Sequence, residues 1–153
     1  MRVTFLCVGR LSAVWRTVWR HYESLVRPYF VLAVREVPEV PLSRGEAVVR
    51  AKEGDALLAL VQSEAYVVAL DARGTTLTSE GLSAFLADKK LHGHSHFQFI
   101  LGGAMGLDER VLARADMCWS LSPLTFPHQM ARCIVLEQLY RAARIERGEP
   151  YHY

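Results

Sequence analysis

The sequence predicts one α/β domain over residues 1–153, with a mainly parallel sheet and helices on both of its faces. Three observations support this fold class. Short apolar runs alternate along the chain with longer amphipathic segments, as in consecutive βαβ units. These runs are apolar at successive positions, which is typical of strands buried on both faces. A hydrophobic content of 51% over 153 residues is sufficient for one core.

The first expected strand covers residues 3–8. Ser12 is a candidate N-cap for the amphipathic helix that follows, because its hydroxyl can accept a hydrogen bond from a free amide. This helix should end near Val26, since Arg27 precedes Pro28 and a residue before proline avoids helical backbone. The pattern indicates a first strand–helix unit.

A second strand is expected at residues 29–37 and a third at residues 66–70, where Asp71 stands at the carboxyl end. Between them, Ser43 and Glu46 have the spacing of a capping box, which predicts that a helix begins there. The apolar side of that helix is expected to carry Ala47, Ala51, Leu58 and Val61.

The second half of the chain continues the alternation. A helix is expected from Thr78 or Ser79, with Leu82, Phe85 and Leu86 on its apolar side. Strands are expected at residues 97–101 and 117–121, with a short helix over residues 108–115 between them, and a last helix covers residues 127–147.

Two strand exits in this half have ligand-binding potential. The fourth strand ends in Gly102-Gly103, and the fifth is followed by the loop at residues 121–126. If these strands are parallel neighbours, their carboxyl ends share the sheet edge at which open α/β sheets bind ligands. A double glycine alone also suits an ordinary tight turn. Together the two loops predict a pocket for a flat, mostly neutral ring.

Composition excludes several other classes of protein. The longest apolar stretch, residues 56–61, is far below the roughly 20 residues that span a bilayer. The first ten residues lack the long apolar run and cleavage site of a signal peptide. We therefore expect a cytoplasmic protein with no membrane partner. The formal charge of +2 neither requires nor excludes a nucleic-acid partner.

No metal site is expected. Cys7, Cys118 and Cys133 are far apart in apolar surroundings, which suits buried thiols better than zinc ligands. His92, His94 and His96 alternate and would share a face of an extended segment, but no cysteine or carboxylate joins them at ligand spacing.

The last helix and the residues after it are rich in charged and aromatic side chains. Arg132, Arg141 and Arg144 lie on this helix, where a solvated charged face is the usual interpretation and a position at the pocket mouth is the alternative. The segment 150–153 is aromatic, whereas chain ends are usually polar and frayed. We expect it to dock on the domain.

Four motifs together resemble one known family. LGGAMG at residues 101–106, SLSPLTFPHQMAR at 120–132, EQLYRA at 137–142 and RGEPYH at 147–152 are similar to the SPOUT methyltransferases that modify large-subunit ribosomal RNA. The resemblance implies a homodimer with a trefoil knot in its carboxyl-terminal half. It also implies binding of S-adenosyl-L-methionine in the knot and methylation at N3 of a pseudouridine in 23S ribosomal RNA, free or within the ribosome.

Carried over by motif, the resemblance implies a cofactor site formed by Leu70, Gly102, Gly103, Leu121, Ser122, Pro123, Leu124, Thr125 and Phe126. On the acceptor side it points to His152, Tyr151 and Arg141 as catalytic residues, with Arg132 and Arg144 as contacts to RNA. Two alternatives stay open: a methyltransferase of the same fold acting on tRNA, and a non-catalytic, ribosome-associated nucleotide-binding module.

Overall fold

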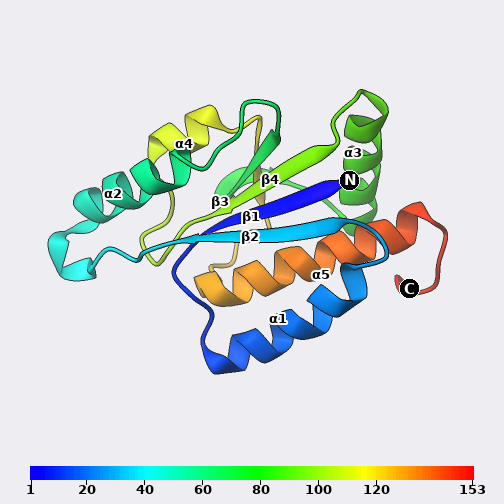
Figure 1. Ribbon diagram of the computed structural model, residues 1–153, viewed down its shortest axis with the longest axis horizontal. Coiled ribbons are helices and arrows are strands. Elements are labelled where there is room, and N and C mark those ends of the chain that lie inside the picture. Colours follow the sequence, from blue (N-terminus) through cyan, green and yellow to red (C-terminus); the bar gives the residue numbers. More distant parts are fainter.

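The computed structural model describes residues 1–153 and contains a five-stranded sheet in the order β2-β1-β4-β3-β5 (Figure 1). Every neighbouring pair of strands is parallel. The strands are β1 (Arg2–Val8), β2 (Val31–Val37), β3 (Tyr66–Thr76), β4 (His96–Leu101) and β5 (Met117–Ser120). The predicted parallel α/β fold is confirmed.

Helices cover both faces of the sheet, as predicted (Figure 1). One face is covered by α1 (Ala13–Val26), α3 (Ser79–Leu91) and α5 (His128–Glu146), and the other by α2 (Glu46–Leu58) and α4 (Glu109–Arg114). Successive residues of β1 enter different cores: Phe5 packs with α1 and α5, while Leu6 packs with α2 and α4. None of the helices combines the length and the apolar content needed to cross a bilayer.

The helix starts agree with the sequence only in part. Thr78 caps α3 through its hydroxyl, which accepts from the Gly81 amide at 2.9 Å. Ser12 occupies the N-cap position of α1 but makes no side-chain cap; its backbone amide donates to Gln129 Oε1 at 2.6 Å instead.

The capping box expected at Ser43 and Glu46 is wrong. Ser43 lies in a short 3₁₀ turn (Leu42–Arg44), and α2 begins after Gly45, whose φ of 92° belongs to the left-handed region that favours glycine. The Glu46 side chain pairs with Arg50 one turn later at 2.7 Å.

The buried side of α2 also differs from the expected one. Its buried residues are Val49, Glu53, Gly54 and Leu57, whereas Ala47 is exposed and Ala51 and Leu58 are only partly buried. A Cβ on Gly54 would lie 2.8 Å from the Cβ of Asp108, so this glycine lets the residue before α4 approach α2 closely.

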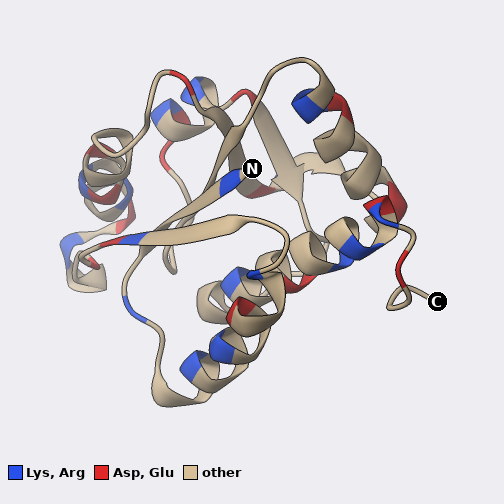
Figure 2. Ribbon diagram, turned by 45° about the vertical axis from the view of Figure 1, so that its right-hand side comes forward, with Lys and Arg blue, Asp and Glu red and all other residues tan.

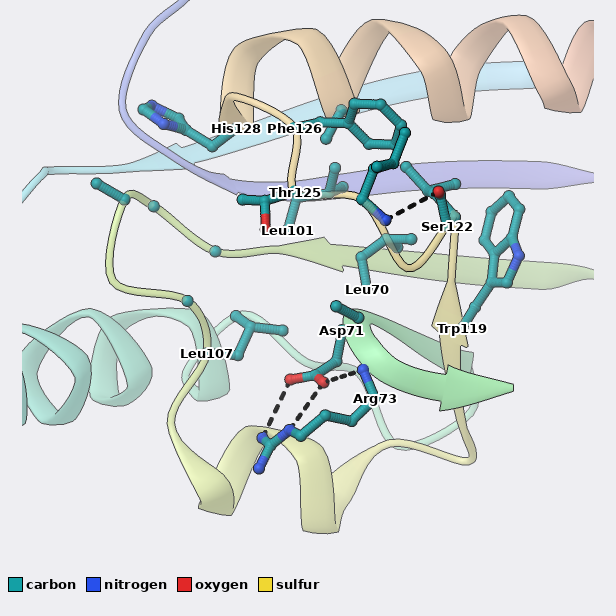
Figure 3. A pocket seen from close by; sticks show the side chains of 18 residues that line it. Leu70, Asp71, Arg73, Leu101, Leu107, Trp119, Ser122, Thr125, Phe126 and His128 are labelled. Carbon is teal, nitrogen blue, oxygen red and sulfur yellow. Dashed lines mark hydrogen bonds and ion pairs between the residues drawn. The ribbon is translucent and has the colours of Figure 1, made fainter. Parts of the chain in front are cut away.

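Strand β3 is longer than expected, and it separates the two strands that were expected to be neighbours. It continues past a register shift between Leu70 and Thr75, so Asp71 stands at an irregularity within the strand. Because β3 lies between β4 and β5, those two strands do not pair. The loops that follow β4 and β5 nevertheless line one cavity, together with Leu70 and Asp71 at the irregular part of β3 (Figure 3).

The chain then crosses the sheet between β5 and α5. It leaves the β5 edge and starts α5 near the end of β1, where Arg132 Nη2 donates to the Gly9 carbonyl at 2.9 Å. The trefoil knot itself stays a prediction from the family resemblance.

Candidate functional site

A cavity of about 370 Å³ lies at the carboxyl ends of β3, β4 and β5 (Figure 3). The structure brings eight of the nine predicted cofactor residues to its wall: Leu70, Gly102, Gly103, Leu121, Ser122, Leu124, Thr125 and Phe126. Pro123, the ninth, is exposed and does not line the cavity. The predicted pocket therefore exists, and we call it the cofactor pocket because its expected ligand is the methyl donor.

Ten further residues of the pocket wall were not among the predicted cofactor residues: Asp71, Ala72, Arg73, Leu101, Ala104, Gly106, Leu107, Trp119, His128 and Ala131. Asp71 had a recognisable signal, since it follows the apolar run of the third strand. Trp119 and Leu107 had none, because which buried side chains end at a cavity depends on strand order.

The turn after β4 requires glycine at position 102, because the backbone of the same turn leaves no room for a side chain there. A Cβ on Gly102 would lie 2.8 Å from the carbonyl carbon of Gly106 and 3.1 Å from the Leu107 side chain. The Gly106 amide donates to the Gly103 carbonyl at 3.1 Å, and Gly106 has a φ of 78°. The tight-turn interpretation is thus correct, and the same turn lines the pocket.

The second loop holds its shape with its own polar groups. Ser120 Oγ donates to the Ser122 carbonyl at 3.2 Å, and Ser122 Oγ accepts from the Leu124 amide at 3.0 Å. These bonds shape the loop around the ends of Leu70 and Trp119 (Figure 3). The pocket therefore offers chiefly backbone and apolar surface to a ligand.

One ionised carboxylate stands on the pocket wall. Arg73 Nε and Nη2 donate to the two carboxylate oxygens of Asp71 at 3.1 and 3.2 Å, and the Arg73 amide adds a bond of 2.8 Å (Figure 3). The side-chain hydrogen bond from Arg73 is the largest cause that lowers the pKa of Asp71, and the backbone hydrogen bond adds to it. Partial burial opposes this change. Asp71 therefore carries its charge at neutral pH.

The three predicted catalytic residues do come together, around Glu137 on α5. Glu137 Oε1 accepts from Arg141 Nη2 at 2.6 Å and from the Tyr151 hydroxyl at 3.0 Å. The Arg141 guanidinium also lies over the Tyr151 ring, 4.6 Å from its centroid. His152 completes this group, which we call the terminal cluster: Glu137, Arg141, Tyr151 and His152. The tail docks as expected.

The protonation of the terminal cluster follows from its geometry. Burial, and then the hydrogen bond to Glu137, raise the pKa of Tyr151 far above its usual value, so the phenol stays neutral. Arg141 can only donate, so His152 Nδ1 is the acceptor in their 3.2 Å contact. His152 Nε2 therefore carries the proton and donates to Glu80 Oε1 at 2.7 Å.

The two arginines expected to contact RNA have structural partners. Arg132 is 2% exposed, with Nη1 bonded to Glu36 Oε2 at 2.6 Å and Nη2 bonded to the ends of β1. It cannot reach an RNA surface in this structure, which corrects the prediction. Arg144 holds the tail, since it pairs with Glu149 and donates to the Tyr29 hydroxyl and the Pro150 carbonyl.

The cofactor pocket lies at the start of α5, and the terminal cluster lies along its second half. His128 at the first turn lines the pocket, whereas Arg141 lies 13 residues further on. At a rise of 1.5 Å per residue, the two positions are about 20 Å apart. Within one chain, the predicted catalytic residues therefore do not reach the predicted cofactor residues.

The remaining candidates take structural positions. His96 is buried and bonds to Thr4 Oγ1 at 2.9 Å, His94 packs edge-on against Tyr66, and His92 contacts the Asp88 carbonyl. No group of three or more His, Cys, Asp or Glu side chains is arranged to hold a metal ion.

Two of the three cysteines are fully buried. Burial raises the pKa of Cys7 to about 12, and Cys133 is buried within the same core. Cys118 is partly exposed, so the expectation of three buried thiols holds for two of them.

The sequence matches a family model described as "Predicted SPOUT methyltransferase" over residues 1–152. Relatives named ribosomal RNA large subunit methyltransferase H are 43% identical in Symbiobacterium thermophilum and 42% identical in Bifidobacterium adolescentis, each covering 99% of both chains. Another relative of that name, in Clostridium acetobutylicum, is 38% identical with the same coverage.

Two solved structures share the fold. A probable methylase family protein from Haemophilus influenzae superposes with a TM-score of 0.59 at 12% identity, covering 99% of this chain and 70% of that chain. A probable methyltransferase from Bordetella pertussis superposes with a TM-score of 0.57 at 17% identity, covering 93% and 94%. At these identities the likeness concerns the fold alone.

Proposed function

The chain belongs to the SPOUT methyltransferase family, and on that premise we propose that it methylates N3 of a pseudouridine in 23S ribosomal RNA with S-adenosyl-L-methionine as donor. The substrate is taken from the printed name of its relatives and from the motifs that this chain shares with them. An RNA substrate of this kind would place the enzyme in the cytoplasm.

The observation that carries the proposal is the pocket at the ends of β3, β4 and β5. Its volume of about 370 Å³ and its mainly apolar wall suit one small ligand with a flat ring. Backbone groups of the glycine turn and the second loop can bond the ring edge, while Leu70 and Leu121 can contact its faces. When bound, the cofactor supplies an electrophilic methyl group.

The terminal cluster is proposed to act on the acceptor. The pseudouridine N3–H must lose its proton before the nitrogen can attack a methyl group, so a base, or a cation that stabilises the resulting anion, accelerates the step. Arg141 provides the cation. Glu137 and His152 are the proton-accepting groups that lie within hydrogen-bond distance of Arg141.

A homodimer would bring the two halves of the site together. Arg141 lies about 15 Å along α5 from Ala131, the nearest pocket residue of that helix, so we propose that the tail that completes a pocket belongs to the partner chain. Next to α5, helix α1 exposes 71% of the Val14 surface and leaves Trp15, Val18 and Tyr22 only partly buried. Apolar groups on an outer helix face are consistent with a symmetric contact between two copies.

The charge distribution bears on how RNA is recognised. Figure 2 shows that Lys and Arg lie on the same helices as Asp and Glu. With a formal charge of +2, purely electrostatic capture of RNA is disfavoured. We therefore propose a large substrate matched in shape, such as the assembled ribosome.

The proposal is tested with ribosomes from cells that lack the gene. Purified protein and labelled S-adenosyl-L-methionine are incubated with whole ribosomes, free 23S ribosomal RNA and tRNA, and the nucleosides are analysed by mass spectrometry. We expect one N3-methylpseudouridine from 23S ribosomal RNA, most efficiently in ribosomes. Label in tRNA would support the alternative substrate, and no label in any RNA would support the non-catalytic module.

A further inference from the structure

Only two buried side-chain atoms in the molecule lack a hydrogen-bond partner, Glu53 Oε1 and His128 Nε2. His128 lines the cofactor pocket, and Glu53 Oε1 lies beside the glycine turn of that pocket. Glu53, on α2, is 4% exposed, and a buried carboxylate oxygen without a partner is costly. The pair therefore points to a ligand group that arrives from outside the chain.

The free oxygen of Glu53 faces the glycine turn. Its other oxygen, Oε2, accepts from the Val40 amide at 3.0 Å, which orients the carboxylate. Oε1 lies 3.2 Å from the position that a Cβ on Gly103 would occupy, and Gly103 lines the cofactor pocket. A side chain at position 103 would press against this oxygen. Burial raises the pKa of Glu53, and the Val40 hydrogen bond opposes that change.

A second cavity of about 350 Å³ adjoins the cofactor pocket at this point. Its wall consists of Glu39, Val40, Pro41, Leu42, Glu53 and Ala104. Ala104 also lines the cofactor pocket, so the two cavities meet at the glycine turn. From the pocket side, His128 Nε2 lies 3.4 Å from Glu39 Oε1. Two carboxylates thus border the junction, and the one Arg on the cavity walls, Arg73, is bonded to Asp71 and Glu109.

The opposite polarity is found at the start of α5. Pro127 occupies the N-cap position and no side chain caps the first turn, whose amides favour negative charge. His128 and Ala131 of this turn line the cofactor pocket. A negative junction beside a positive helix end suits a zwitterion with its ammonium toward Glu39 and Glu53 and its carboxylate toward α5.

Building on the proposed function, we propose that Glu53, assisted by Glu39, binds the α-ammonium of the cofactor's methionine portion, so that the second cavity is the subsite for the amino-acid head. The adenosine portion then occupies the pocket between the two loops. Glu53 touches the cofactor away from the reacting methyl group, and its role is in binding.

The inference is tested by calorimetric titration with two stable probes. S-adenosylhomocysteine carries the amino-acid head, and 5′-methylthioadenosine lacks it. Glu53→Gln keeps an acceptor for the Val40 amide and removes the charge, while Glu46→Gln on the exposed side of α2 is the matched control. We expect Glu53→Gln to weaken the binding of S-adenosylhomocysteine about tenfold or more. The affinity for 5′-methylthioadenosine should fall less than about twofold.

Glu39→Gln provides a second variant that does not depend on replacing a buried residue, since its carboxylate is largely exposed. We expect a smaller loss that is again confined to S-adenosylhomocysteine. Equal losses for both probes, or no loss for either in both variants, would overturn the subsite while leaving the proposed function intact. Failure of the unaltered protein to bind either probe would contradict the proposed function itself, and the subsite with it.

Discussion

The cofactor pocket and the terminal cluster, which both include residues of α5, are formed by different kinds of groups. At the start of α5, the cofactor pocket is made of turn backbone and apolar side chains, and its shape depends on Gly102, where a Cβ would lie 2.8 Å from the Gly106 backbone. Along the second half of α5, the terminal cluster is made of charged and polar side chains that bond to one another through Glu137. The pocket is fixed by packing, whereas the cluster is held by contacts that an incoming substrate can exchange.

This difference separates binding from chemistry. A change in the pocket should alter cofactor affinity, and a change in the tail should alter turnover without altering that affinity. Each of the following variants either breaks this separation or measures it more finely.

Deletion of residues 151–153 should have the largest effect. It removes Tyr151 and His152 from the terminal cluster, so turnover on ribosomes should fall by about a hundredfold or more. Calorimetric affinity for S-adenosylhomocysteine should stay within about twofold. Deletion of Tyr153 alone, which is fully exposed, is the control and should change neither quantity. Unchanged turnover after the longer deletion would exclude the tail from the chemistry.

Gly102→Val should abolish cofactor binding at the other end. The new side chain would press on the Gly106 backbone, so the turn must open and the protein should also lose about 1–3 kcal/mol of unfolding free energy. Gly93→Ala is the control, because Gly93 has a φ of 94° in open space away from the pocket. It should cost about 1 kcal/mol and leave affinity unchanged. Tight binding by a folded Gly102→Val protein would contradict the pocket.

Arg132→Met should act on stability alone. Its guanidinium ties Glu36 and the end of β1 to α5, so its loss should lower the unfolding free energy by about 2 kcal/mol, less than for a fully buried pair because Glu36 is partly exposed. Denaturant titration checks this. Arg10→Met, at an exposed residue, should stay within about 0.5 kcal/mol. A stable Arg132→Met protein with weakened RNA binding would instead support the prediction that Arg132 contacts RNA.

Arg73→Met should give the smallest effect, which is visible only in how the unfolding free energy changes with pH. Because Arg73 lowers the pKa of folded Asp71 below its ordinary 3.8, the ion pair stabilises the fold above that pH and loses this contribution as the pH falls through the lowered value. Because the Arg73 side chain is exposed, water screens the ion pair and the difference in stability at neutral pH should be small. Urea titrations of the two proteins should converge at acidic pH, below the ordinary pKa of Asp71. A difference that does not depend on pH would contradict this coupling.

Local patterns were enough to predict most elements of the fold. Four of the five strands lie within two residues of the expected ranges, because the apolar runs are bounded by glycine, proline and polar residues. The start of α2 could not be found in the same way. Ser43 has capping chemistry, but the left-handed Gly45 begins the helix and leaves Ser43 in the preceding turn.

Strand order was not contained in those local patterns. Nothing in residues 97–121 indicates that β3 inserts between β4 and β5, and this insertion is what adds Asp71 and Arg73 to the pocket. Arg132 shows the same limit. Its partner Glu36 is 96 residues away in the chain. The local pattern therefore predicts a solvated Arg132 side chain, although this side chain is buried.

The measurement that tests the two-ended site most directly mixes two inactive proteins. Gly102→Val lacks a pocket but keeps the tail, and the protein without residues 151–153 keeps the pocket but lacks the tail. If each pocket works with the partner's tail, an equal mixture exchanged into mixed dimers should recover about a quarter of the activity of the unaltered protein, because half of the dimers are mixed and each holds one complete site. Thr125→Trp in the exposed second loop replaces Gly102→Val if the latter does not fold. A mixture of folded, exchanging dimers that stays inactive would contradict the account.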